Sequence, residues 1–225
     1  NEIEAIIVTL PRKLSYEVLK DLIKLGKPIL TEKPLCLNYK NALNLISLCK
    51  KYKTYIKVGY MKRHDSGTSI FIDKIKSFKN KNISLINTLC FMGDSYCNPF
   101  GDFKGKEFLL INSTEEKMPN WLDEENHYAY EQFINVFSHI TNIVEYVFNS
   151  NLKIKSASIS ASGEGILLGL IADHPISFSL CRGRQNEWKE SISIKYEDCE
   201  LSIEYPPPFL RNMPSTIIIS SGEKY

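Results

Sequence analysis

The sequence contains no apolar run of about 18 residues or more, which is the length that a membrane span needs. It also contains no C-x-x-C pair and no ligand-spaced histidines, which argues against a metal site. The formal net charge is only +2, and the basic residues are spread along the 225 residues, which argues against a nucleic-acid-binding face. No secretory signal is evident, so the six cysteines are predicted to be reduced thiols of a cytoplasmic protein.

Short apolar runs alternate with helical patterns in the first part of the chain. Amphipathic helical patterns follow the first two runs, with Ser15 and Asn38 as their predicted N-caps. The first run is rich in β-branched residues, which is typical of a strand covered on both faces. The alternation predicts right-handed βαβ units in a parallel sheet. The predicted strands are 5–10, 28–31 and 55–60.

The pattern changes after Arg63. Residues 69–78 and 128–148 have helical periodicity, and 93–127 are rich in loop-forming residues. The predicted strands are 83–91, 152–160, 166–172, 176–181, 188–196 and 201–205. We therefore predict an α/β protein in two parts. Residues 1–63 form the C-terminal half of a Rossmann-type parallel sheet, and residues 64–225 form an α+β domain with an open, mainly antiparallel sheet.

Polar or functional side chains follow each of the three strands predicted in residues 1–63. In a doubly wound sheet, ligands bind outside the carboxyl ends of the strands. A lysine at the floor of a cleft can be desolvated and can then exchange a proton with a substrate hydroxyl. From position alone, an ordinary charge pair on a surface loop is an equal alternative for Glu32 and Lys33. The three segments are Thr9-Leu10-Pro11, Glu32-Lys33-Pro34 and 59–63.

The order of these segments resembles the Gfo/Idh/MocA oxidoreductase family over some sixty residues. The family's second domain usually carries an Asp-x-x-x-His helix after a Trp. Here Trp121 precedes His139 by 18 positions, and Asn135 stands where the family has Asp. Residues four apart on a helix share a face, so we expect Asn135 and His139 to point into one cleft. The matching motifs are Thr9 with Pro11, Gly26-Lys27, Glu32-Lys33-Pro34-Leu35, and Val58-Gly59-Tyr60 with Arg63.

The resemblance implies an NAD- or NADP-dependent oxidoreductase. Such an enzyme transfers a hydride to or from a hydroxyl-bearing carbon of a sugar, sugar nucleotide or cyclitol. It implies Lys33 as the proton donor or acceptor and a homo-oligomer formed through the C-terminal sheet. The implied site residues are Lys33, His139 and Asn135 for catalysis, Thr9, Leu10, Pro11, Glu32, Lys33 and Arg63 for the cofactor, and Lys33, Tyr60, Trp121, Asn135 and His139 for the substrate.

Several features depart from the family pattern. The absent G-x-G-x-x-G turn belongs upstream of Asn1, so we expect an N-terminally truncated piece that is inactive alone, with NAD and NADP both open. Asn135 cannot take a proton at neutral pH. Ser15 stands where the family often has His, and Ala129-Tyr130-Glu131 replaces a Gly-Gly run. The alternatives are a non-catalytic binding or regulatory relative and an interaction domain that uses its exposed sheet face.

Overall fold

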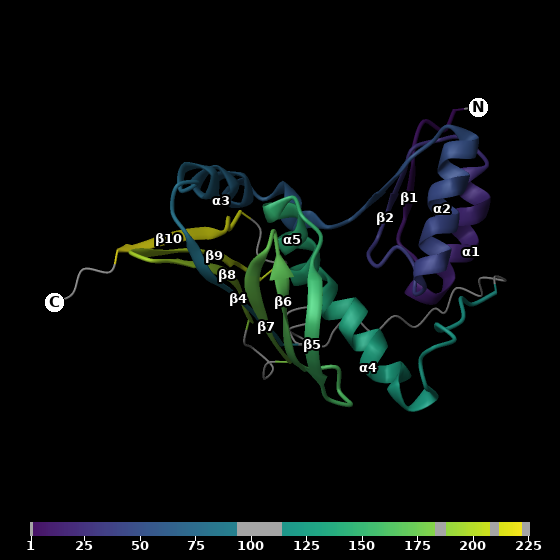
Figure 1. Ribbon diagram of the computed structural model, residues 1–225. Helices are drawn as coiled ribbons and strands as arrows, with labels where there is room; N and C mark the ends of the chain where they lie inside the picture. Colours follow the sequence, from purple (N-terminus) through teal and green to yellow (C-terminus); the bar gives the residue numbers. More distant parts are fainter. Residues whose placement is uncertain (1, 94–113, 183–187, 208–211, 222–225) are drawn as a thin grey trace. The chain divides into compact units, whose positions relative to one another are not determined.

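The computed structural model describes residues 2–93, 114–182, 188–207 and 212–221 (Figure 1). Within these ranges the chain divides into two compact units. The first unit contains residues 2–60 and 114–135, and the second contains 61–93 and the described residues from 136 onward. Residues 114–135 thus pack with the first unit, whereas the sequence assigned them to the second domain. The predicted domain boundary at residue 63 itself stays a prediction.

The first unit is built on a parallel β-sheet, as predicted. Its strands pair in the order β1-β2-β3, with Ile6 opposite Ile29 and Ile29 opposite Ile56. A helix follows each of the first two strands, which is the βαβ arrangement that the alternating pattern indicated. The elements are β1 (Ile6–Val8), α1 (Arg12–Ile23), β2 (Ile29–Thr31), α2 (Tyr39–Tyr52) and β3 (Ile56–Val58).

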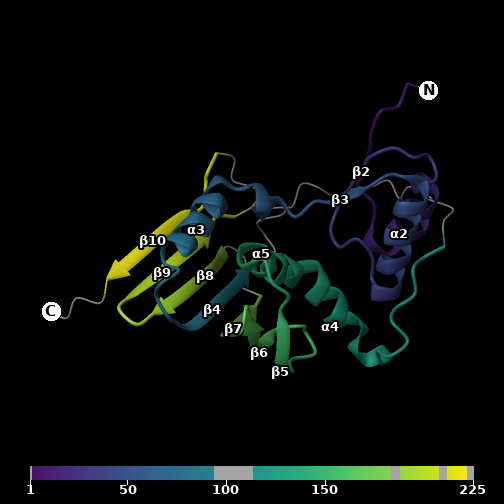
Figure 2. The same ribbon diagram turned by 45° about the horizontal axis from the view of Figure 1, so that its top comes forward.

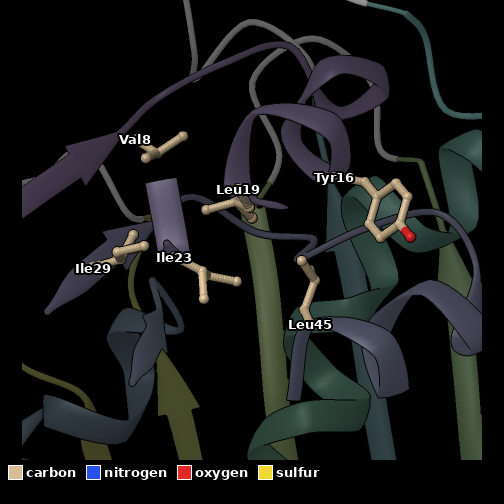
Figure 3. Packing of buried hydrophobic residues seen from close by; sticks show 6 residues of the cluster. All are labelled: Val8, Tyr16, Leu19, Ile23, Ile29 and Leu45. Atoms are coloured by element: carbon tan, nitrogen blue, oxygen red, sulfur yellow. The ribbon is translucent and has the colours of Figure 1, made fainter. Parts of the chain in front are cut away.

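The two helices pack side by side against the sheet and enclose an apolar core (Figure 1). Ile7 is 73% exposed and Leu30 is 46% exposed, so their strands are covered on one face only in the described part of the chain. The expectation of cover on both faces is therefore wrong here, because alternate side chains of β1 and β2 point to opposite faces and only one face meets the helices. The core residues are Val8, Tyr16, Leu19, Ile23, Ile29 and Leu45 (Figure 3).

The helix starts place the loops that follow the strands. Helix α2 begins after Asn38, whose side chain accepts the backbone N–H of Lys40 at 3.0 Å, which confirms the predicted cap. Helix α1 begins at Arg12, directly after Pro11, and Ser15 lies buried inside it. The prediction of Ser15 as the N-cap is therefore wrong. Proline has a backbone φ already suited to a helix start, so the helix begins earlier.

The second unit is built on a seven-stranded sheet in the order β10-β9-β8-β4-β7-β6-β5 (Figure 2). Strands β4 and β7 pair in parallel, and the other neighbouring strands of this sheet pair antiparallel, which confirms the mainly antiparallel prediction. The edge strand β10 was not predicted. The strands are β4 (Ile83–Met92), β5 (Lys153–Ile159), β6 (Gly165–Ile171), β7 (His174–Cys181), β8 (Trp188–Tyr196), β9 (Cys199–Tyr205) and β10 (Thr216–Ser221).

The segment predicted as one helix over 128–148 has an internal irregularity. Helix α4 (His127–Gln132) continues into a π-helical segment, Phe133–Phe137, and then into α5 (Ser138–Phe148). A single π turn inside an α-helix is rare and is frequent at functional sites. The border between the two units falls within the π segment, after Asn135.

Helices cover one face of the large sheet, and among the described residues none of the helices packs on the other face. Helix α3 (Ser66–Ser77) packs on β9, β10 and α5, and the short 3₁₀ helix η1 (Met61–His64) packs on both helices. On the opposite face Ile166 is 53% exposed and Leu168 is 49% exposed. No helix in the described ranges combines the length and apolar character needed to cross a membrane.

A buried ion pair joins η1 to the centre of the large sheet. Lys62 Nζ lies 2.6 Å from Glu190 Oε2, and the two side chains are 7% and 0% exposed. The lysine also faces the rings of Trp188 and Tyr205, at 5.6 and 5.9 Å from their centroids. No disulfide joins any two of the five described cysteines, and Cys97 lies outside the described residues.

Candidate functional site

The carboxyl ends of the three strands of the first unit meet at one edge, as the sequence predicted. Glu32 N–H donates to the carbonyl of Val8 at 3.0 Å, and Gly59 N–H donates to the carbonyl of Thr31 at 2.8 Å. The chain therefore leaves β2 with Glu32 and Lys33 at the level where β1 and β3 end. The peptide bond between Lys33 and Pro34 is cis.

Two predicted catalytic residues are in direct contact at this edge. Lys33 Nζ donates to the backbone carbonyl of Asn135 at 2.5 Å and to Asn135 Oδ1 at 3.1 Å. They are separated by 102 positions in the sequence, so the contact is a product of the fold. Both acceptor oxygens are neutral. An aspartate at this position would instead place a negative charge beside the ammonium.

A pocket of about 610 Å³ opens around this contact. That volume lies in the range of small-molecule sites, about 300–1,000 Å³. Half of its lining was predicted from the sequence, and half was not. The predicted lining residues are Leu10, Pro11, Glu32, Lys33 and Asn135, and the others are Arg12, Lys13, Leu14, Glu115 and Glu131.

Three predicted site residues of the first unit do not line this pocket: Thr9, Tyr60 and Trp121. Trp121 is 73% exposed and meets the ring of Tyr130 edge-on, with the centroids 5.8 Å apart. The Tyr130 hydroxyl donates to the carbonyl of Leu37 at 2.7 Å, and burial raises the pKa of Tyr130. Tyr130 therefore ties the start of the helix that carries Asn135 to the segment after Lys33-Pro34.

One wall of the pocket carries an ion cluster that the sequence did not reveal. Glu131 Oε1 lies 2.9 Å from Lys13 Nζ, and Glu131 Oε2 lies 3.8 Å from Arg12 Nη1. Arg12 Nη1 also donates to the backbone carbonyl of Glu131 at 3.1 Å. Two features of the sequence could have indicated this cluster. Arg12 and Lys13 directly follow Pro11, and Glu131 belongs to the segment 129–131 that stands where the family has a Gly-Gly run.

Glu116 holds the segment between Lys33 and helix α2 in place, and it was also not predicted from the sequence. Its buried carboxylate accepts N–H groups of Leu37 and Asn38 at 2.8 and 3.0 Å and the side-chain amide of Asn41 at 2.7 Å. Its own N–H donates to the carbonyl of Lys13 at 2.6 Å. Burial raises the pKa of this carboxyl above its usual value. Nothing in the sequence marked Glu116, because it lies in the region that was interpreted as a loop.

Two further predicted residues belong to the second unit. Arg63 Nε donates to Asn142 Oδ1 at 2.8 Å, and its guanidinium lies 5.1 Å from the centroid of the Tyr146 ring, so its side chain is held against α5. His139 is half-buried on α5. Asn135 lies in the π segment, whose turn is wider than the α-helical turn on which the shared-face expectation rests. A common face for Asn135 and His139 therefore stays a prediction.

Comparison with known proteins identifies relatives of both parts of the chain. Residues 1–60 match the family model described as "Oxidoreductase family, NAD-binding Rossmann fold" (GFO_IDH_MocA). A stretch of 123 residues is 24% identical to the rhizopine catabolism protein MocA of Rhizobium meliloti, and it covers 54% of this chain and 38% of that protein. The matched stretch thus covers well under half the length of this relative.

Solved structures share the fold over most of the chain. One is a 3-ketoreductase from Actinomadura kijaniata in complex with TDP-benzene and NADP, with a TM-score of 0.72, 12% identity, and coverage of 100% of this chain and 64% of the other. Another is the WlbA dehydrogenase from Bordetella pertussis in complex with NADH and UDP-GlcNAcA, with a TM-score of 0.68, 12% identity, and coverage of 91% and 56%. At these identities the likeness shows the fold alone.

Proposed function

We propose, from the match of residues 1–60 to the Gfo/Idh/MocA oxidoreductase family model, that the protein is an NAD- or NADP-dependent oxidoreductase. It transfers a hydride to or from a hydroxyl-bearing carbon of a sugar, sugar nucleotide or cyclitol. The observation that carries this proposal is Lys33, whose ammonium lines the 610 Å³ pocket within the family-matching segment and is held there by Asn135.

The pocket fits the nicotinamide end of such a cofactor. Leu10 and Pro11 form an apolar wall of the pocket. The exposed Glu32 carboxylate can accept hydrogen bonds from the hydroxyls of a ribose. The 225 residues contain no G-x-G-x-x-G turn, and no residue is assigned to the pyrophosphate.

Lys33 supplies the acid–base part of the reaction. The dinucleotide, when bound, takes or gives the hydride. In the oxidative direction, neutral Lys33 accepts the proton of the substrate hydroxyl as the C–H bond breaks, and in the reductive direction the ammonium returns it. Asn135 holds the Lys33 amine in place and cannot itself act as a base. The roles that the resemblance implies for Thr9, Tyr60, Arg63, Trp121 and His139 remain predictions.

The test is hydride transfer by the full chain that its gene encodes. NADH, NADPH and their oxidised forms are combined with a panel of sugars, nucleotide sugars and inositols, and absorbance at the reduced nicotinamide band is followed. We expect Lys33→Met to lower kcat by a factor of about 10² to 10⁴. Lys57→Met is the matched control, because Lys57 is exposed on β3 and does not line the pocket. No transfer with any substrate, or equal rates for both variants, would refute the proposal.

A non-catalytic binding relative is the second candidate. It is favoured by Asn135, since an amide stands where the family has Asp. In that case the full chain would bind the dinucleotide and a sugar ligand in calorimetric titrations, yet no member of the panel would be turned over. Turnover that depends on Lys33 would exclude this candidate.

We also propose that the protein forms a homo-oligomer through the open face of the large sheet. Ile166 and Leu168, which are 53% and 49% exposed, present apolar side chains on that face of β6. Burying such side chains against a second copy is favourable. Light scattering after chromatography should give an oligomeric mass for the native protein and a monomeric mass for Leu168→Lys. A monomeric native protein would refute this assignment.

A further inference from the structure

Glu131 connects the start of α1 to the helix that carries Asn135. Its carboxylate lies 2.9 Å from Lys13 Nζ, and its backbone carbonyl accepts a hydrogen bond from Arg12 Nη1 at 3.1 Å. Arg12 is the first residue of α1, directly after the end of the β1 loop. The side chain and the backbone carbonyl of Glu131 therefore both contact the first two residues of α1, Arg12 and Lys13, which line the pocket.

The attachment lies one helical turn before the contact with Lys33. Glu131 and Asn135 are four positions apart, and both line the same pocket. Between them the helix passes from α4 into the π segment. Only four residues of helix separate Glu131 from Asn135. A displacement of Glu131 would therefore also displace Asn135 and its two acceptor oxygens. Those oxygens accept from Lys33 Nζ at 2.5 and 3.1 Å.

The ion pairs themselves add little to global stability. The side chains of Arg12, Lys13 and Glu131 are 27%, 41% and 24% exposed, and pairs with this degree of solvent contact contribute weakly. Their consequence is geometric. A catalytic group that is displaced by about 1 Å can lose a large factor in rate. The cluster lies where it can prevent such a displacement.

We propose that Glu131 is a positioning residue. Held by Arg12 and Lys13, it fixes the helical turn that presents Asn135 to Lys33. This inference rests on the proposed function of Lys33 in proton exchange. It adds a requirement that the family motifs do not contain, namely an ion cluster in place of the Gly-Gly run.

The first test needs no cofactor or substrate. Hydrogen–deuterium exchange is compared for the native full chain, Glu131→Gln and Glu17→Gln. Glu17 is a matched control, because it pairs with Lys20 on α1 at 2.6 Å with side chains 32% and 30% exposed. We expect Glu131→Gln to speed exchange of the Phe133–Phe137 amides by about tenfold while α2 is unchanged. Unchanged exchange, or an equal increase in Glu17→Gln, would overturn the proposal.

The second test uses turnover with the panel substrate that the native protein converts fastest. We expect Glu131→Gln to lower kcat by about tenfold with KM changed by less than about twofold. Lys13→Met, which removes the shorter ion pair, should lower kcat in the same way. The exchanged pair Lys13→Glu with Glu131→Lys should recover kcat to within about threefold of the native value, since the contact is restored with opposite sign.

The outcomes separate this inference from the proposed function. If the native protein transfers hydride and Lys33→Met abolishes it, while Glu131→Gln behaves like Glu17→Gln, the positioning role is wrong and the function stands. If the exchanged pair is no better than Glu131→Gln alone, the positioning role is also wrong. If the native protein transfers no hydride, both proposals fail.

Discussion

The carboxylate of Glu116 accepts the backbone N–H of Leu37 at 2.8 Å, although the two residues are 79 positions apart. The same carboxylate accepts the N–H of Asn38 and the amide of Asn41, so it satisfies donors at the start of α2. The segment between Lys33 and α2 is thus tied to a distant part of the chain. The conformation of the candidate site depends on a residue outside the motif that identifies it.

Removal of the Glu116 carboxylate should destabilise the protein. We expect Glu116→Ala to lower the free energy of unfolding by about 1–3 kcal/mol, because the buried N–H of Leu37 loses its acceptor. Urea unfolding followed by circular dichroism measures this change. The neighbouring Glu115→Ala is the control, because Glu115 is exposed. Equal losses in the two variants would contradict the prediction.

Glu116 should also make stability depend on pH. Burial raises the pKa of this carboxyl from its ordinary value of 4.5, so the folded state holds the proton more tightly than the unfolded state. The contribution of this group to the free energy of unfolding is therefore fully present below 4.5 and falls as pH rises through the raised pKa. Glu116→Gln has no such group. As pH rises from 4.5, the native protein should therefore lose more unfolding free energy than Glu116→Gln does. A difference between the two proteins that does not change with pH would contradict this prediction.

The charge beside Lys33 should set the pH range of catalysis. Asn135→Asp places a carboxylate next to the ammonium and favours its charged form. We expect the pH at which kcat/KM for oxidation reaches half its maximum to rise by about one unit. Asn126→Asp makes the same change of net charge at an exposed position and should leave the profile unchanged. Identical profiles for the two variants would show that Lys33 is not the titrating group.

The buried pair Lys62–Glu190 should behave as a unit. Lys62→Met leaves Glu190 as an unpaired charge in the core and should cost about 3–5 kcal/mol of unfolding free energy. The double variant Lys62→Met with Glu190→Leu should recover most of that loss, because both charges are gone and their volume is refilled. Chemical unfolding of the native protein, of Lys62→Met, of Glu190→Leu and of the double variant completes a double-mutant cycle. A double loss equal to the sum of the single losses would contradict the pairing.

The sequence predicted those parts of the fold that follow from local patterns. The βαβ alternation gave the parallel sheet, and the period-two runs gave strands β5 to β9. A helix was also predicted over 128–148, but its π segment was not, because a five-residue segment is too short for its wider turn to change the pattern of apolar residues. Strand β10 was missed because it is almost entirely exposed and so lacks an alternating pattern.

The candidate site divides in the same way. Lys33 and Asn135 were predicted by a family motif and a spacing, and the fold brings them together. Arg12, Lys13, Glu131 and Glu116 act through contacts between distant segments. A charged residue looks the same in the sequence whether its side chain is solvated or makes such a contact. One sequence without its fold cannot separate these cases.

The place of β4 in the large sheet has a consequence for the synthesis of the protein. This strand pairs with β7 on one side and with β8 on the other, and both follow it by a long stretch of chain. It therefore leaves the ribosome well before either partner exists, and the backbone N–H and C=O groups along both of its edges are then unpaired. Such non-local pairing slows folding. Until β7 and β8 have been synthesised, β4 has neither of its partners, and an unpaired strand of this kind favours aggregation.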